Sequence, residues 1–232
     1  MAKKKQQHFA EMKTFDCVFE PSNEQMLAGD YHLKGKWNSE YFGNENPITL
    51  ELGCGKGEYS IELAKKYPHR NFIGVDVKGA RLWRGSKTAE TEQYSNVAFL
   101  RTKIEFINNF FAPDEIAEIW LTFSDPQPKD RKGTKRLTSE IFMSRYFRML
   151  SKPRIVHIKT DSTVLYKRTM ESLENVNHEL LEHTTNLYGD DWLTFSEEQR
   201  EILAIKTFYE QKWLAEKKNI HYIKITLTDE DK

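Results

Sequence analysis

The chain has 232 residues, a length that suits one α/β domain, or one domain with a small appendage. Its 35 basic and 35 acidic residues cancel, so the net charge gives no indication of nucleic-acid binding. No apolar run approaches the roughly 20 residues of a membrane-spanning helix, and 30% of the residues are charged, so we expect no membrane association. Only two cysteines occur, Cys17 and Cys54, which favours a reducing, cytoplasmic location without disulfide bonds. Neither an HExxH nor a CxxC pattern is present, so we expect no metal.

The N-terminal segment is locally basic although the chain is neutral. It begins MAKKKQQHFAEMKTF and has the cations of a signal peptide, but no apolar stretch follows them. We therefore expect a basic arm and lead-in segment over residues 1–46, partly mobile, and a single domain over residues 47–232. No obligatory protein partner is implied, and the chain is expected to be a monomer or a homodimer.

From residue 47 onward, short β-type runs alternate with helical stretches. The predicted strands are ITLEL (48–52), NFIGVDV (71–77), NVAFL (96–100), EIWLTF (118–123), RIVHIKT (154–160) and IHYIKITL (220–227). The predicted helices cover 58–66, a stretch ending near Tyr94, 139–150, and 162–175, which leads to HELLEHT (178–184). This alternation predicts a mostly parallel sheet with helices on both faces. In such sheets, ligands bind beyond the carboxyl ends of the strands.

The segment ELGCGKGE, residues 51–58, joins the first predicted strand to the first predicted helix. Gly53, Gly55 and Gly57 allow a tight turn and let a ligand approach the backbone, although turn formation alone would also explain them. A nicotinamide-binding loop needs GxGxxG, but Glu58 occupies the third glycine position, and its charge would oppose a pyrophosphate. The loop also lacks the GxxxxGK[ST] pattern of a nucleoside-triphosphate site.

Two acids lie at the ends of the first two predicted strands. S-adenosylmethionine carries a sulfonium, an amino group and a free ribose but no phosphate, so its site needs acids and backbone groups. Glu51 is placed to meet the positive methionine portion, directly or through water. Asp76, 19 residues beyond Gly57, is placed to accept both ribose hydroxyls. Either acid alone could be structural, but together they favour S-adenosylmethionine as the cofactor.

A second segment, FSDPQPKDRKGTKRL over residues 123–137, concentrates positive charge behind Asp125. The prolines of DPQP limit backbone freedom, so we expect Asp125 to be held at the end of the fourth strand. Lysine and arginine side chains can then position phosphates without specifying sequence. A charged run is normally a solvated loop, but the adjacent DP and the acids at the earlier strand ends favour a functional role here.

This segment resembles the motif FxDPWPKxxHxKRRL of the bacterial tRNA (guanine-N7-)-methyltransferases of the TrmB type, without a gap from Asp125 to Leu137. ELGCGKG, GVDV, HIKTD (157–161) and TFYEQKW (207–213) resemble further motifs of that family in the expected order. The resemblance covers roughly residues 47–228. It implies a class I, Rossmann-like S-adenosylmethionine-dependent methyltransferase of the α/β class, with a mostly parallel seven-stranded sheet and helices on both faces.

The resemblance also implies an activity and a set of site residues. The activity is methyl transfer from S-adenosylmethionine to N7 of a guanine in the variable loop of tRNA, with S-adenosylhomocysteine as product. The expected cofactor-binding residues are Glu51, Gly53, Gly55, Asp76 and Asp125, and Asp125 is also the implied catalytic residue. The implied substrate-binding residues are Lys129, Asp161, Thr207, Phe208, Tyr209 and Glu210. The implied contacts to the tRNA backbone are Arg131, Lys132, Lys135 and Arg136.

The chemistry of guanine agrees with this set. N7 has an in-plane lone pair and no proton, so no strong general base is required, and the chain has no candidate His–Asp dyad. The methylated base is cationic, so a carboxylate such as that of Asp125 can stabilise the charge as it develops. Asp161 and Glu210 could accept hydrogen bonds from N1–H and the exocyclic amine, and the sequence does not say which acid does which.

The chain departs from the family motifs at several positions. Gln127 replaces a tryptophan, and Lys103 falls where an adenine contact is usual, so no adenine contact is assigned. Two other hypotheses stay open at this point. In the first, the chain is an S-adenosylmethionine-dependent methyltransferase that acts on another RNA or on a small molecule. In the second, it is a non-catalytic RNA-binding protein with a relic of the pocket.

Overall fold

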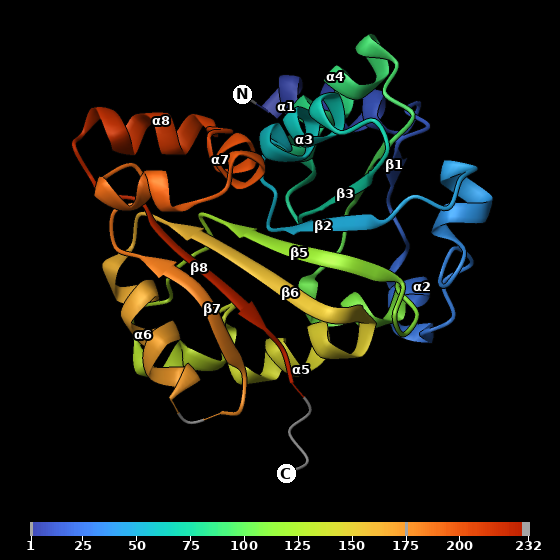
Figure 1. The fold of residues 1–232 in the computed structure, drawn as a ribbon. Helices are drawn as coiled ribbons and strands as arrows, with labels where there is room; N and C mark the ends of the chain where they lie inside the picture. The colour runs from blue at the N-terminus through green and yellow to red at the C-terminus, as the bar shows by residue number, and fades with distance from the viewer. Residues whose placement is uncertain (1, 175, 229–232) are drawn as a thin grey trace. The chain divides into compact units, whose positions relative to one another are not determined.

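The computed structural model describes residues 2–174 and 176–228, without the side chains of residues 2–5 and 130–132. The chain forms two compact units, Met1–Ile116 and Ala117–Lys232. Each unit contains strands with helices packed beside them (Figure 1). In the described part of the chain no helix is long and apolar enough to cross a membrane.

The strands of the first unit pair in parallel, in the order β1-β4-β3-β2. They are β1 (Val18–Phe19), β2 (Ile48–Leu52), β3 (Asn71–Val75) and β4 (Val97–Leu100). The helical segments are α1 (Ala2–Met12), α2 (Asn23–Ala28), the π-helix η1 (Trp37–Phe42), α3 (Glu58–Lys66), α4 (Gly79–Glu92) and the 3-10 helix η2 (Ile104–Asn109). Every residue of β2, β3 and β4 is buried, which explains why these strands are mostly apolar, with Thr49, Glu51 and Asn71 as buried polar exceptions.

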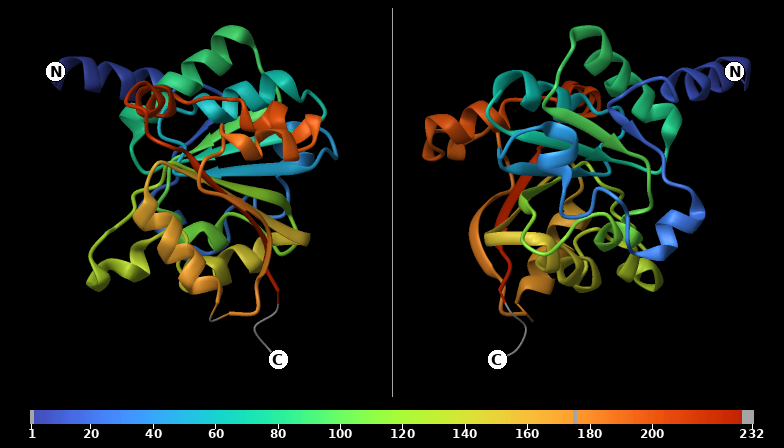
Figure 2. Two further views of the ribbon diagram at one scale, coloured as in Figure 1. Left: turned by 60° about the vertical axis from the view of Figure 1, so that its left-hand side comes forward. Right: turned by 90° about the vertical axis from the view of Figure 1, so that its right-hand side faces the viewer.

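The predicted N-terminal arm contains helix α1, which packs against α4 (Figure 2). The His8 ring stacks on Trp83 with a centroid distance of 3.7 Å. The Glu11 carboxylate accepts hydrogen bonds from Trp83 Nε1 (2.7 Å) and Lys87 Nζ (2.5 Å), and the bond from Lys87 holds the pKa of Glu11 below its usual value. The predicted arm therefore begins with a helix whose C-terminal part packs on α4 within the first unit. Its predicted partial mobility stays a prediction.

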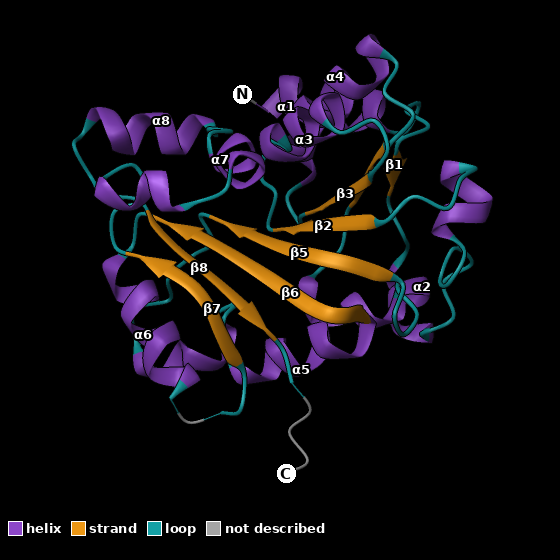
Figure 3. Ribbon diagram, viewed as in Figure 1, coloured by secondary structure: helices purple, strands orange, loops and turns teal. Residues whose placement is uncertain are grey.

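The second unit contains four strands in the order β5-β6-β8-β7. They are β5 (Ile116–Thr122, whose first residue ends the first unit), β6 (Leu150–Thr160), β7 (Glu179–Thr184) and β8 (His221–Thr226). β8 is antiparallel to both β6 and β7, and the arrowheads of β5 and β6 point the same way (Figure 3). The helical segments are the 3-10 helices η3 (Asp130–Lys135) and η4 (Asp190–Thr194), and α5 (Glu140–Met149), α6 (Thr163–Leu173), α7 (Glu197–Leu203) and α8 (Phe208–Ala215).

The predicted α/β class with mostly parallel strands is confirmed, with one difference in the strand count. The described residues contain eight strands where seven were predicted. The additional strand is β1, which has only two residues and pairs with β4 through Val18 and Phe19. A two-residue strand has no periodicity of its own, so its assignment depends on its partner.

Candidate functional site

The glycine loop follows β2 and ends where α3 begins at Glu58. Gly53, Gly55 and Gly57 all have positive φ values, of 79°, 57° and 69°, which other residues rarely adopt. A Cβ atom at Gly57 would lie 2.4 Å from the Phe99 ring, so packing also requires a glycine there. A Cβ atom at Gly55 would have nothing within 4 Å. Gly57 therefore closes the loop against the core, whereas Gly55 borders open space in which a ligand can approach the backbone.

Asp76 follows β3 and holds this loop in place. Its Oδ2 accepts a hydrogen bond from the backbone N–H of Gly55 at 3.0 Å, and its Oδ1 accepts one from the N–H of Lys78 at 2.7 Å. Each carboxylate oxygen has two lone pairs, so both oxygens can accept a further bond. Asp76 can therefore orient the loop and accept a pair of ribose hydroxyls, and these residues fit S-adenosylmethionine.

Glu51 lies within β2 and is bonded to the beginning of α3. Its Oε2 accepts hydrogen bonds from the backbone N–H of Ser60 (3.0 Å) and from Ser60 Oγ (2.5 Å). The side chain is buried, and a carboxylate near a helix N-terminus is favourable electrostatically. Glu51 thus joins strand to helix, and its predicted contact with the methionine portion of the cofactor stays a prediction.

Cys54, within the same loop, is buried. Burial, followed by the nearby Glu51 and Asp76 carboxylates, raises the pKa of the Cys54 thiol well above its usual value. A thiol that stays protonated is a poor nucleophile. Cys54 is therefore a small buried residue that fills the loop and not a nucleophile.

Asp125 lies in the turn that follows β5, and its side chain is exposed. Its Oδ1 accepts a hydrogen bond from the backbone N–H of Gln127 at 3.0 Å. Phe123 and Gln127, on either side of it, have φ values of 52° and 41°. Left-handed conformations are unfavourable for large side chains and often occur at functional sites. The Phe123 N–H donates to the carbonyl oxygen of Lys159 at 2.8 Å, which joins this turn to β6.

Among the cationic side chains described in the basic loop after Asp125, one is bonded to the protein backbone and two are not. Arg136 Nε donates to the carbonyl oxygens of Pro126 (3.2 Å) and Gln127 (3.1 Å), so this residue supports the turn in addition to its predicted contact with the tRNA backbone. Lys129 and Lys135 are exposed, and within the described part of the chain their ammonium groups have no partner. The side chains of Arg131 and Lys132, predicted to contact tRNA, lie outside the described residues.

Asp161 follows β6 and is half-buried. Among the described residues its carboxylate has no hydrogen-bond or ion-pair partner. Its charge does act on His221, because burial lowers the pKa of that imidazole and the Asp161 carboxylate opposes the lowering. The next residue, Ser162, begins α6, because its Oγ accepts a hydrogen bond from the N–H of Leu165. A half-buried carboxylate without a partner beside a helix cap can accept hydrogen bonds from a ligand.

The predicted substrate-binding segment forms the first turn of α8. Thr207 is its N-cap, with Oγ1 accepting from the Glu210 N–H at 3.2 Å. Phe208 and Tyr209 are 53% and 40% exposed, and their rings contact edge to face at 5.6 Å. Glu210 points the other way and is fully buried, with Oε1 2.9 Å from Lys159 Nζ. The structure therefore presents two aromatic side chains to solvent and keeps the acid inside.

Comparison with known proteins identifies the family. A family model described as "Putative methyltransferase" matches residues 45–223. The tRNA (guanine-N(7)-)-methyltransferase of Christiangramia forsetii is 44% identical over 97% of this chain and 99% of its own length. That of Bacteroides thetaiotaomicron is 46% identical over 99% of this chain and 88% of its own length. The chain belongs to the tRNA (guanine-N(7)-)-methyltransferase family.

Solved methyltransferase structures have the same fold. The 16S rRNA methyltransferase KamB is 12% identical, with a TM-score of 0.57 over 82% of this chain and 92% of that one. The 30S ribosomal A1408 methyltransferase from an uncultured bacterium is 16% identical, with a TM-score of 0.55 over 81% of this chain and 90% of that one. The predicted class I fold and the family predicted from five motifs are both confirmed, and the chain is an S-adenosylmethionine-dependent methyltransferase.

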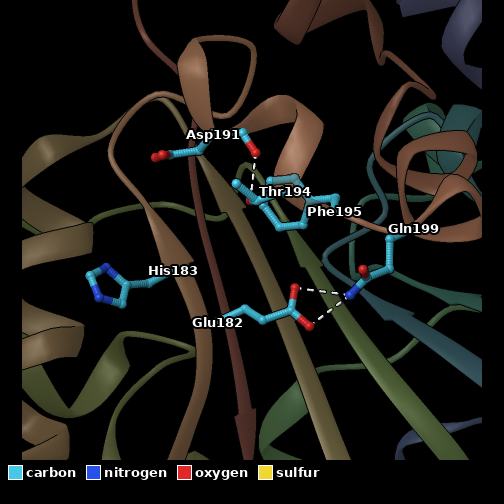
Figure 4. A pocket seen from close by; sticks show the side chains of 6 residues that line it. All are labelled: Glu182, His183, Asp191, Thr194, Phe195 and Gln199. Carbon is cyan, nitrogen blue, oxygen red and sulfur yellow. Dashed lines mark hydrogen bonds between the residues drawn. The ribbon is translucent and has the colours of Figure 1, made fainter.

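This methyltransferase also has a pocket of about 420 Å³ that none of the predicted site residues line (Figure 4). Its lining residues are Glu182, His183, Asp191, Thr194, Phe195 and Gln199. Glu182 Oε1 accepts hydrogen bonds from Gln199 Nε2 (2.7 Å) and Lys224 Nζ (3.0 Å). Asp191 accepts one from Thr184 Oγ1 at 2.7 Å. These bonds attach the segment around η4 to β7. The polar side chains that line the pocket therefore hold the structure together, and we assign no ligand to it.

Three residues hold the predicted site residues in place, a role that was not predicted for them from the sequence. Ser60 fixes Glu51, and Lys159 and Tyr188 both bond Glu210. For Lys159, the signal available in the sequence was its position inside the predicted strand RIVHIKT, where a lysine is unusual. Within the described part of the methyltransferase, no group of three or more His, Cys, Asp or Glu side chains could hold a metal ion.

Proposed function

We propose that this methyltransferase transfers a methyl group from S-adenosylmethionine to N7 of a guanine in the variable loop of tRNA, in the cytoplasm. The observation that carries the proposal is the identity of 44% and 46% to tRNA (guanine-N(7)-)-methyltransferases over nearly the whole chain. The position of the guanine in the variable loop rests on the motif resemblance. We also propose that the protein needs neither a metal nor an obligatory protein partner and works as a monomer or a homodimer.

The first unit supplies the residues that hold the cofactor. Open space at Gly55 and the spare lone pairs of Asp76 support binding of the methionine portion and the ribose there. Glu51 adds negative charge beside the loop, and a contact through water suits its buried position. When bound, S-adenosylmethionine supplies an electrophilic methyl group, and S-adenosylhomocysteine is the product.

The second unit supplies the residues that hold and stabilise the guanine. The exposed Asp125 carboxylate, fixed by its bond to Gln127, lowers the energy of the positive charge that develops on the ring. Asp161 has an unpartnered carboxylate among the described residues, so it can accept from N1–H or the exocyclic amine of guanine. Orientation of the base and stabilisation of charge are sufficient, because N7 has no proton to remove.

The tRNA backbone and the bases beside the guanine have their own contacts. The exposed Lys135, together with the predicted Arg131 and Lys132, neutralises phosphates. Lys129, for which the motifs imply a contact with the substrate nucleoside, is exposed in the same loop, and we place its charge beside a phosphate as well. Phe208 is an exposed aromatic residue in α8, and such side chains stack on unpaired bases.

One experiment tests the proposal directly. The protein is incubated with labelled S-adenosylmethionine and an unmodified tRNA transcript, and the methylated position is located by borohydride–aniline cleavage. We expect cleavage at one guanine of the variable loop, and no cleavage with a transcript in which adenine replaces that guanine. Label on another position or on another RNA would contradict the proposed acceptor. Absence of any transfer would support the RNA-binding relic instead.

A further inference from the structure

Lys159 is a fully buried lysine near the carboxyl end of β6. Its ammonium lies 2.9 Å from Glu210 Oε1 and donates to the carbonyl oxygens of Leu203 (3.0 Å) and Ile205 (3.1 Å). The Tyr188 hydroxyl lies farther from this ammonium, at 3.4 Å. An ammonium has three N–H donors, so its three nearer partners satisfy it. Burying a charge is unfavourable unless it is paired and hydrogen-bonded, so this lysine fixes the positions of its partners.

Tyr188 completes the network from a third segment of the chain. Its hydroxyl donates to Glu210 Oε1 at 2.5 Å, and its ring centroid lies 5.9 Å from the Lys159 ammonium. Burial, followed by the Glu210 carboxylate, raises the pKa of Tyr188 far above its usual value. The hydroxyl therefore keeps its proton and remains a donor to the carboxylate.

The partners of Lys159 lie at the end of α7, in the turn that follows it, and in the first turn of α8. Leu203 is the last residue of α7, Ile205 lies in the turn, and Glu210 lies in the first turn of α8. Carbonyl groups at a helix end have no partner within the helix, and Lys159 supplies one. The network therefore attaches the beginning of α8 to the end of β6, as the closeness of these elements in Figure 1 also shows.

The residues next to Glu210 on α8 face the opposite way. Phe208 and Tyr209 are the exposed aromatic pair, and they directly precede the buried acid. Because the backbone of this turn is fixed through Glu210, the two rings are presented in a defined orientation. Stacking on a base depends on such orientation, since the contact is between two flat faces.

We propose that Lys159, Glu210 and Tyr188 form a positioning network that orients Phe208 and Tyr209 for the tRNA, and that Glu210 does not touch the guanine. The inference rests on the proposed function and deepens it. It replaces the expectation that Glu210 accepts a hydrogen bond from the base, because its carboxylate is fully buried and its oxygens are bonded to Lys159 and Tyr188. Asp161 is then the acceptor for the edge of guanine.

The first test compares guanine with inosine at the target position of the tRNA, using the Glu210→Gln variant. Inosine lacks the exocyclic amine, so an acid that binds the amine sets the ratio of kcat/KM between the two substrates. We expect Glu210→Gln to raise KM for both tRNAs about tenfold and to leave their ratio unchanged. Asp161→Asn is expected to bring the ratio close to one. A ratio that collapses in Glu210→Gln would overturn the proposal.

The second test is a double-mutant cycle between the network and the exposed ring. Phe208→Ala is expected to raise KM for tRNA about tenfold in the unaltered protein, in line with the loss of one stacking contact. In the Glu210→Gln background the same change is expected to raise KM only about twofold, because the ring is no longer held in place. Equal effects in both backgrounds would show that the network does not act through Phe208.

Two further variants keep the tests decisive if a buried change impairs folding. Lys159→Met combined with Glu210→Leu removes both charges, and is expected to be about tenfold more active than Glu210→Leu alone. Lys167→Met, the same substitution at an exposed lysine of α6, is expected to change nothing. A double variant as inactive as Glu210→Leu, with normal calorimetric binding of S-adenosylmethionine, would contradict the network. Absence of methyl transfer in the unaltered protein would contradict the proposed function instead.

Discussion

The acids of the two units are held in different ways. In the first unit, Glu51 is bonded to Ser60, 9 positions away, and Asp76 is bonded to Lys78 and Gly55, 2 and 21 positions away. In the second unit, Glu210 is bonded to Lys159, which is 51 positions away. The cofactor-binding acids are thus fixed mainly by their own strand–loop–helix segment, whereas the substrate-binding segment depends on contacts between distant segments. A substitution in the first unit should therefore act locally, and one in the second should spread to other residues.

The largest expected effect is that of Asp125, an acid of the second unit that is held by a neighbouring residue. Among the described residues, its carboxylate accepts one hydrogen bond, from the N–H of Gln127 two residues away. We expect Asp125→Ala to lower kcat by roughly 10² to 10³, since it removes the carboxylate that stabilises the developing charge. Single-turnover methylation of saturating tRNA measures this directly.

Asp125→Asn is the matched control, because the amide oxygen can still accept from the Gln127 N–H. If charge is what matters, the asparagine variant is nearly as inactive as the alanine variant. If the asparagine variant kept the kcat of the unaltered protein, Asp125 would act only by shaping its turn, and the assignment of a catalytic role would be wrong.

The second prediction concerns stability in the first unit. It tests whether the packing of Gly57 against Phe99 adds to the cost of its backbone conformation. Gly57→Ala brings a Cβ atom to 2.4 Å from the Phe99 ring at a φ of 69°, so strain and overpacking add. Gly43→Ala has nearly the same φ, 64°, and nothing within 4 Å. We expect Gly57→Ala to lower the free energy of unfolding by about 2–5 kcal/mol and Gly43→Ala by about 1–2 kcal/mol.

Chemical denaturation of both variants measures the difference. Adding Phe99→Leu to Gly57→Ala should recover part of the loss, because the smaller side chain makes room for the methyl group. If the two glycine variants were equally destabilised, backbone strain alone would explain Gly57, and its packing against Phe99 would contribute nothing.

The third prediction separates the two acids of the first unit. Asp76→Ala removes the acceptor for the N–H groups of Gly55 and Lys78 and for the proposed ribose hydroxyls. We expect the Kd for S-adenosylmethionine to rise about tenfold to a hundredfold by calorimetry, from the loss of charge-assisted hydrogen bonds. Glu51→Gln, which still accepts from Ser60, is expected to change Kd less. A larger loss in Glu51→Gln would show that Glu51 meets the cofactor directly.

The same distinction explains how much of the fold was predictable from the sequence. β2 and α3 were predicted to the residue, because a buried β-branched run, a glycine loop and Pro68 all lie within a short segment. β3 ends two residues earlier than predicted, because Asp76 leaves the strand to bond the N–H of Lys78. These are local effects, and the sequence carries nearly all the information about them.

Other elements were missed although local signals existed. Neither α7 nor α8 was predicted, yet Ser196 with Gln199 forms a capping box, and Thr207 with Glu210 has the same spacing. The N-caps observed at both positions show that this pattern would have located both helices. The burial of Glu210 could not be found in this way, because it depends on a lysine in another element.

The roles of the site residues stay predictions, and their hydrogen-bond partners were not indicated by the sequence. Asp125, Phe208 and Tyr209 are exposed, as a contact with tRNA requires. Arg136 is also bonded to two carbonyl groups of the DPQP turn, a contact that spacing alone did not indicate. Motifs identify which residues the family uses, but the hydrogen-bond partners of each depend on the packing of this particular chain.

The smallest expected effect is that of the exposed cations of the basic loop. Lys129 and Lys135 have no partner in the described part of the structure, so each is free to neutralise one phosphate. Lys129→Ala and Lys135→Ala should each raise KM for tRNA a few fold and reduce the slope of log K against log salt by about 0.7–0.9. Lys65→Ala, at an exposed position of α3, is the matched control and should leave the slope unchanged. Because these lysines act through charge and not through packing, their effects should add, whereas those of Glu210 and Phe208 should not. A double variant whose slope falls by no more than that of a single variant would place the two lysines on one phosphate and would make the basic loop a single contact.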